Sequence, residues 1–173
     1  MSGSLQQARA AGAQRLPAGV RAVVGGGLLA GTIDIGSACL INSLAPPVIL
    51  HAIASGVLGA ASFRDGMPAA LAGLGLQWAM SLLIAGIYVA AASRWALLRR
   101  HSIGAGIAYG LVIYIVMNYV VVPLSAAPFA PPRQPIKMFE NVLAMILFGL
   151  IVAAASQLAG VGGRAARRAA PGA

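Results

Sequence analysis

Residues 21–44 read RAVVGGGLLAGTIDIGSACLINSL. This stretch is long enough to cross a bilayer as a helix, because about 20 helical residues span roughly 30 Å of hydrocarbon. It carries one ionisable side chain, Asp34, well inside the apolar run. Contact between a carboxyl group and acyl chains is costly, so we expect Asp34 to face other protein or a water-filled cavity.

Composition indicates that the whole chain is a membrane protein. It has 173 residues, of which 60% are hydrophobic and only 9% are charged, whereas soluble domains carry about 25% charged residues. Several separate apolar runs approach or exceed the ~18 residues that indicate spanning helices. We therefore predict a single transmembrane domain over residues 21–160, with basic cytoplasmic tails at 1–20 and 161–173.

The net charge of +9 does not indicate a nucleic-acid-binding protein. The arginines stand in short clusters beside the apolar runs and form no basic domain. In those positions they set membrane orientation and contact anionic lipid headgroups. The expected partners are the anionic headgroups of the bilayer, with a second copy or another membrane protein as further candidates, and no nucleic acid.

Four of the apolar runs are long enough to span. Pro68 opens the second and Pro123 closes the third, because proline is tolerated in the first turn of a helix but not in its interior. The first run is longer than the ~7–15 residues of a signal-peptide core and contains Asp34, so we expect it to remain uncleaved. The predicted spans are residues 22–43, 68–92, 103–122 and 138–160.

Residues 48–62 form a shorter apolar run. A helix of about 15 residues is roughly 22 Å long, which is short for a span and fits a re-entrant or interfacial helix better. With four spans, nine of the twelve basic residues lie on one side and Arg64, Arg133 and Lys137 on the other, as the positive-inside rule expects. A fifth span would divide them six and six. We therefore predict an all-α membrane protein with four spans, a short outer-side helix and both termini in the cytoplasm.

Two of the predicted spans carry a glycine pair at a spacing of four. Gly27 and Gly31 lie on one face of the first span, and Gly106 and Gly110 on one face of the third. Small residues at this spacing let helix backbones approach closely in lipid. Each face also carries a polar residue further along, Asp34 in the first span and Asn118 in the third. We expect both faces to contact other helices.

Polar side chains gather at one depth of the predicted bundle. At 1.5 Å per helical residue, they fall at the midplane or in the outer half of the bilayer. We predict one polar pocket open to the outer side; the alternatives are a structural hydrogen-bond network between helices and a proton or cation site at Asp34. The candidate residues are Asp34, Asn42, His51, Gln77, Asn118, Glu140 and Asn141.

The sequence predicts no metal, cofactor or catalytic centre. His51 and His101 fall on opposite sides of the predicted membrane, so they are not expected to ligate one haem iron. Cysteine, histidine and acidic residues form no cluster at metal-ligand spacing. Only three acidic residues are present in the chain, which leaves few candidates for acid–base or two-metal catalysis.

The chain contains the patterns GTIDI at 31–35, IASGVLG at 53–59, YG at 109–110 and MNYVVVPLS at 117–125. These four patterns resemble a group of small bacterial inner-membrane proteins without an assigned activity. A weaker similarity is to YagU-like inner-membrane proteins and rests on residues 140–142, ENV, at the start of the last span. The resemblance implies a multi-pass bacterial membrane protein and supplies no substrate.

Three functions remain open at this point. The leading expectation is a non-enzymatic helical bundle that associates with a partner or with itself through its glycine faces. The alternative is a small proton- or cation-coupled transporter or channel that uses Asp34, assisted by Asn118 and Glu140. The third is an enzyme that acts on lipid.

Overall fold

The computed structural model describes residues 16–128 and 134–161. Within these residues 88% are helical and none is in a strand, so the predicted all-α class is confirmed. Much of each predicted tail, and residues 129–133 of the proline-rich loop, lie outside the described residues. The helices are α2 (Ala18–Asn42), α3 (Pro46–Leu58), η1 (Gly59–Phe63), α4 (Gly66–Arg94), α5 (Ala96–Arg100), α6 (Ser102–Val116), η2 (Met117–Val121), α7 (Val122–Leu124) and α8 (Pro135–Leu158).

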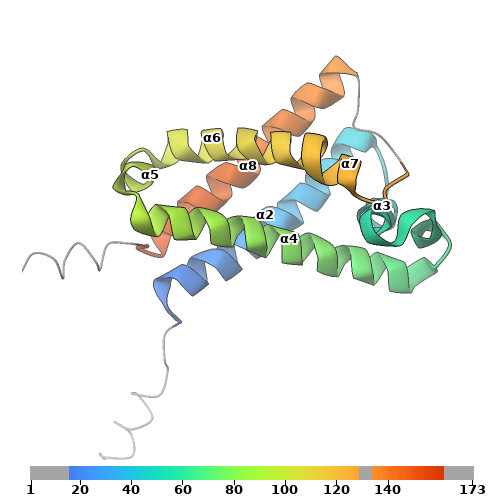
Figure 1. The fold of residues 1–173 in the computed structure, drawn as a ribbon, viewed down its shortest axis with the longest axis horizontal. Helices are drawn as coiled ribbons and strands as arrows, with labels where there is room; N and C mark the ends of the chain where they lie inside the picture. The colour runs from blue at the N-terminus through green and yellow to red at the C-terminus, as the bar shows by residue number, and fades with distance from the viewer. Residues whose placement is uncertain (1–15, 129–133, 162–173) are drawn as a thin grey trace, which may run out of the picture.

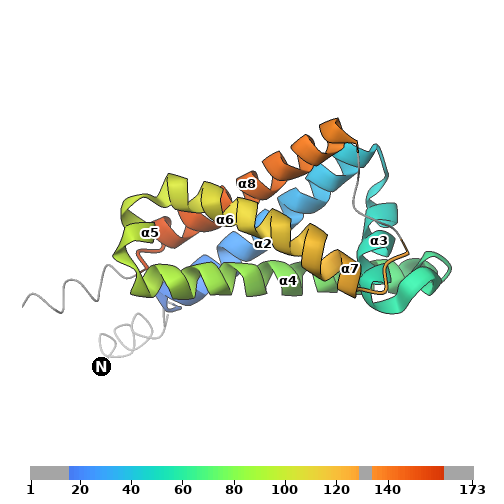
Figure 2. The ribbon, with the colours of Figure 1, turned by 45° about the horizontal axis from the view of Figure 1, so that its top comes forward.

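The four long helical segments form two layers. In Figures 1 and 2, α2 and α8 lie side by side, and α4 and α6 cross over them. The helices α2 and α4 run antiparallel to each other. At one end of their contact, Ala22 packs against Val89 in a buried apolar cluster. A second cluster joins all four helices through Ala30, Tyr88, Ile113 and Val152.

Glycines set the spacing between the layers. A Cβ added to Gly27 would lie 3.2 Å from the Cα of Leu82 on α4, and one added to Gly106 would lie 3.1 Å from the Cα of Leu150 on α8. At Gly110 the added atom would lie 2.6 Å from the Cα of Ile146. The backbones therefore approach at distances that a larger side chain would prevent.

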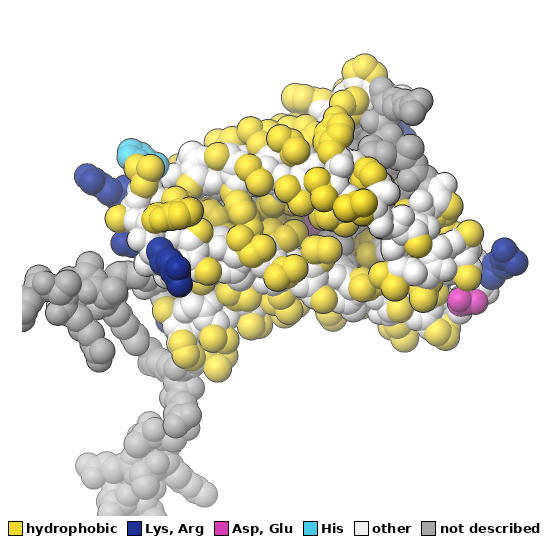
Figure 3. All heavy atoms as spheres, in the orientation of Figure 1, with side chains coloured by type: hydrophobic (Ala, Val, Ile, Leu, Met, Phe, Trp, Pro, Cys, Tyr) yellow, Lys and Arg dark blue, Asp and Glu magenta, His cyan; other side chains and the backbone are white. Residues whose placement is uncertain are grey.

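The face of the bundle drawn in Figure 3 is largely apolar. Large side chains such as Leu40 (82% exposed) and Ile103 (71% exposed) point outward from the helices, whereas much of the interior is alanine, glycine and serine. An apolar surface of this extent suits a hydrocarbon environment. Five helical segments are long and apolar enough to cross a membrane.

The segment formed by α3 and η1 differs from the other four in direction. It is one of the five segments that meet the length and composition requirements, at 18 residues. However, it lies across one end of the bundle, while α2, α4, α6 and α8 run roughly along its length (Figures 1 and 2). It crosses α4 at Gly73, whose missing side chain leaves room for the backbone of Leu50.

We predicted that the third span ends before Pro123, and this prediction is wrong. The helix instead widens to π geometry at Met117–Val121 and continues through Pro123 to Leu124. At the end of this wide turn the N–H of Val122 donates to the carbonyl of Met117, five residues back. Proline lacks an N–H, and in a regular α-helix its ring clashes with the carbonyl four residues earlier. The wider turn accommodates it.

Candidate functional site

The candidate site is the polar contact between α2 and α4. The side-chain amide of Gln77 donates from Nε2 to Oδ2 of Asp34 over 2.8 Å, and more weakly to the carbonyl of Gly31 over 3.4 Å. Asp34 therefore faces another helix, as its position in an apolar run requires. The donor is a neutral amide, which stabilises the carboxylate without cancelling its negative charge.

The close approach at Gly31 brings these side chains within reach. A Cβ at Gly31 would overlap the side chain of Ser81, which is 1% exposed. The hydroxyl of Ser81 donates to the carbonyl of Gln77 over 2.8 Å, so its own polar group is satisfied within α4. Glycine on α2 and serine on α4 thus let Gln77 reach Asp34 one turn further along.

A second polar contact flanks the first one. The indole N–H of Trp78 donates to Oγ1 of Thr32 over 3.4 Å, and the Thr32 hydroxyl donates to the carbonyl of Leu28 over 2.8 Å. Both residues are exposed at the side of the contact. Together the two pairs of residues hold α2 to α4 at one depth of the bundle.

The contact between Asp34 and Gln77 lies nearer to the end of the bundle that carries α3 than to the opposite end. Asp34 stands 16 residues after Ala18 and 8 before Asn42, or about 24 Å and about 12 Å along the helix. Gln77 is 11 residues from Gly66 and 17 from Arg94. The pair therefore lies past the middle of both helices, toward the end that carries α3.

Three of the predicted pocket residues hydrogen-bond within their own helices. Asn42, Asn118 and Asn141 each donate from Nδ2 to the carbonyl four residues earlier, over 2.9, 3.0 and 2.8 Å. For Asn118 this bond lies where the helix changes to π geometry. These amides satisfy local carbonyls and do not hydrogen-bond to Asp34.

The remaining two predicted residues also stand apart from the Asp34–Gln77 pair. His51 interacts through Nε2 with the carbonyl of Gly66 over 2.8 Å, and its own carbonyl accepts a bond from Ser62 over 3.0 Å, which joins α3 and η1 to the start of α4. Glu140 lies half-buried in the second turn of α8. Of the seven residues, the structure joins Asp34 and Gln77 directly. One shared pocket stays a prediction.

The structure contains a pair of tyrosines that the sequence analysis did not single out. The rings of Tyr88 on α4 and Tyr109 on α6 lie 5.1 Å apart between centroids, tilted by 57°. The hydroxyl of Tyr109 donates to the carbonyl of Ile84 over 2.7 Å. A pocket of about 520 Å³ opens beside them, toward α5. Both tyrosines are in apolar runs, where sequence alone does not separate a packing ring from a ring that lines a pocket.

No group of three or more histidine, cysteine, aspartate or glutamate residues able to hold a metal ion occurs in the part of the chain that the structure describes. Comparisons of the chain with protein-family models, with curated proteins and with solved structures found no match. The assignment of a function therefore depends on the geometry of the chain itself.

Proposed function

We propose that this chain is a multi-pass protein of the bacterial inner membrane with four spans and both termini in the cytoplasm. The nine-to-three distribution of its basic residues supports this orientation. The crosswise position of α3 supports its assignment as a re-entrant or interfacial helix, which the basic residues place on the outer side. The resemblance of residues 31–35 and 117–125 to small bacterial inner-membrane proteins supports the assignment to the bacterial inner membrane.

Within that protein, the Asp34–Gln77 contact favours a small proton- or cation-coupled transporter or channel, which acts without enzymatic catalysis. An acidic side chain inside a membrane domain commonly marks an ion path, because its charge is poorly solvated there. Gln77 holds one oxygen of the carboxylate, Oδ2. We assign the other oxygen, Oδ1, to the proton or cation.

Association with a partner or with a second copy is the competing function. The glycine pairs that were expected to serve it are used inside the chain: Gly27 and Gly31 contact α4, and Gly106 and Gly110 contact α8. An associating protein would therefore use a different face. In that case Asp34–Gln77 is a structural contact of the kind that contributes about 0.6–2 kcal/mol in membrane proteins.

Flux measurements in proteoliposomes separate the two functions. We expect the wild-type protein to give ion- or pH-dependent flux, and Asp34→Asn to abolish it. The matched control is Asp65→Asn, which should leave the flux intact. Asp65 is an exposed acid just before α4, and its side chain makes no cap hydrogen bond. Absence of flux in the wild type, together with a co-purifying membrane protein, would favour association instead.

A further inference from the structure

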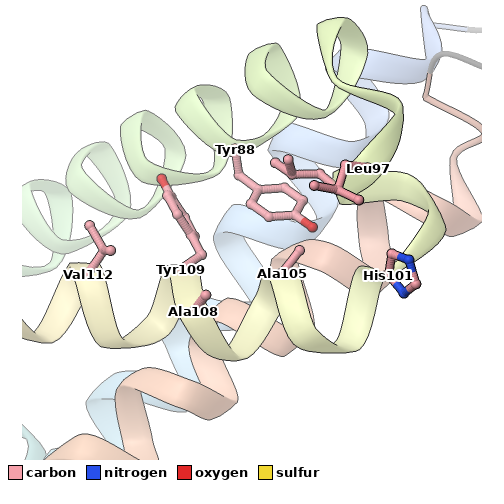
Figure 4. Close-up of a pocket in the computed structure, with 8 residues that line it drawn as sticks. Tyr88, Leu97, His101, Ala105, Ala108, Tyr109 and Val112 are labelled. Carbon is pink, nitrogen blue, oxygen red and sulfur yellow. The ribbon is translucent and has the colours of Figure 1, made fainter.

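The pocket beside the two tyrosines is built by three helices at the end of the bundle opposite α3 (Figures 1 and 4). Its volume of about 520 Å³ is in the range of small-molecule sites, about 300–1,000 Å³. The lining is apolar apart from two tyrosines and one histidine. The lining residues are Tyr88, Leu97, Leu98, His101, Ala105, Ala108, Tyr109 and Val112.

Tyr88 supplies a polar group to this apolar space. Its side chain is 2% exposed, and its hydroxyl points into the pocket in Figure 4. The Tyr109 hydroxyl is already bonded to the carbonyl of Ile84, whereas no hydrogen bond joins the Tyr88 hydroxyl to another group in residues 16–128 or 134–161. No buried side-chain N or O atom in the described residues lacks a hydrogen-bond partner, so the Tyr88 oxygen is accessible from the pocket and can take a partner there. A ligand with an acceptor oxygen would provide one.

Arginines stand next to lining residues in the sequence at this end of the molecule: Arg99 follows Leu98, and Arg100 precedes His101. Arg94 ends α4, and Arg99 and Arg100 end α5. Arg99 donates to the carbonyls of Ala92 and Ser93, over 2.5 and 3.4 Å, while Arg94 and Arg100 are exposed. Figure 3 shows basic side chains and a histidine gathered at this end of the molecule.

The pocket extends from this charged end into the bundle. From Ser102 to Val112 is ten residues, or about 15 Å of helix, which reaches from the membrane surface to about the middle of the hydrocarbon. Tyr88 stands six residues before Arg94, or about 9 Å deeper than it. The site therefore combines an apolar lining with one hydroxyl donor, at an end of the molecule that carries arginines.

We propose that this pocket binds one anionic glycerophospholipid. An acyl chain occupies the space between α4 and α6, the Tyr88 hydroxyl donates to an ester carbonyl, and the phosphate lies near Arg94, Arg100 and His101. The combination of nearby positive charge, one hydroxyl donor and an apolar lining suits the phosphate, the ester and the acyl chain of such a lipid. A zwitterionic lipid fills the same pocket less well, because its headgroup positive charge opposes the arginines.

Native mass spectrometry of the full chain, equilibrated with phosphatidylglycerol and phosphatidylcholine, tests the proposal. We expect the wild type to retain one phosphatidylglycerol in preference to phosphatidylcholine. Arg100→Gln should weaken this preference by about fivefold, as one basic residue at an anionic surface contributes. Its matched control is Arg64→Gln, at the α3 end, which should leave the preference unchanged. Equal retention of both lipids by the wild type would overturn the proposal, as would equal effects of the two arginine variants.

Two further variants test the pocket itself. Ala108→Leu puts a larger side chain on an exposed lining position and should remove the retained lipid, whereas Ala79→Leu, on an exposed position of α4 outside the lining, should not. Tyr88→Phe keeps the ring and removes the hydroxyl, so retention of phosphatidylglycerol should fall about fivefold for one lost hydrogen bond. Wild-type retention by both Ala108→Leu and Tyr88→Phe would overturn the proposal. If Ala108→Leu does not fold, Tyr88→Phe decides alone.

Discussion

The hydroxyl of Tyr109 on α6 donates to the backbone carbonyl of Ile84 on α4 over 2.7 Å. Near this bond the two helices are separated by the pocket and meet through the rings of Tyr88 and Tyr109. The carbonyl of Ile84 is in the middle of α4, so an interior position of one helix is fixed to α6 by a side chain.

Removal of this bond should loosen the two helices. We expect Tyr109→Phe to lower the free energy of unfolding in detergent by about 1 kcal/mol, because hydrogen bonds between membrane helices contribute about 0.6–2 kcal/mol. Denaturant titration of the purified protein measures the change. Tyr119→Phe is the matched control, since Tyr119 is 63% exposed. Equal effects of the two variants would show that the Tyr109 bond contributes nothing.

The contact of Gly110 with α8 should tolerate no larger side chain. A Cβ there would lie 2.6 Å from the Cα of Ile146, which is backbone and cannot move aside without displacing α8. We expect Gly110→Ala to destabilise the protein by about 1–3 kcal/mol, the usual effect of overpacking. Gly104→Ala, with open space around the added atom, should be neutral or stabilising. Size-exclusion profiles and denaturant midpoints of the two variants make the comparison.

Cysteine labelling at the two ends of the α3–η1 segment tests the membrane topology of the chain. With four spans, Ser43 before α3 and Asp65 after η1 lie on the same, outer side of the membrane. We expect Ser43→Cys and Asp65→Cys, each made in a Cys39→Ser background, to react equally with a membrane-impermeant thiol reagent added to intact cells. Ser93→Cys, at the other end of α4, should react only after the cells are opened. Labelling of position 43 without position 65 would mean that α3 crosses the membrane.

Much of the helical layout follows from the sequence. The predicted spans 22–43, 68–92 and 138–160 agree with α2, α4 and α8 to within four residues at each end. The reason is that a bilayer imposes one length on apolar runs, and glycine and proline mark their ends. The requirement that Asp34 meet protein also follows from the cost of a carboxyl group in lipid.

Other features do not follow from the sequence because lipid-facing and protein-facing surfaces are both apolar. A soluble helix shows its buried side by a change from polar to apolar residues, and no such change separates the two sides of α4. The contact partner of Gly110, the crossing of Leu50 over Gly73 and the pocket at Tyr88 therefore require the structure. We also did not predict the π turn before Pro123, because an interior proline usually ends a helix.

Asp34 lies against Gln77 on α4, and we expect this contact to shield the carboxyl group from lipid. The most direct measurement is cross-linking in membranes with a short bifunctional thiol reagent, using Asp34→Cys with Gln77→Cys in a Cys39→Ser background. Ile33→Cys with Gln77→Cys is the control, because Ile33 is the neighbouring residue and is exposed on another face of α2. We predict that the first pair is linked within one chain and that the control pair is not. Equal linking of the two pairs, or linking of the control pair alone, would contradict it.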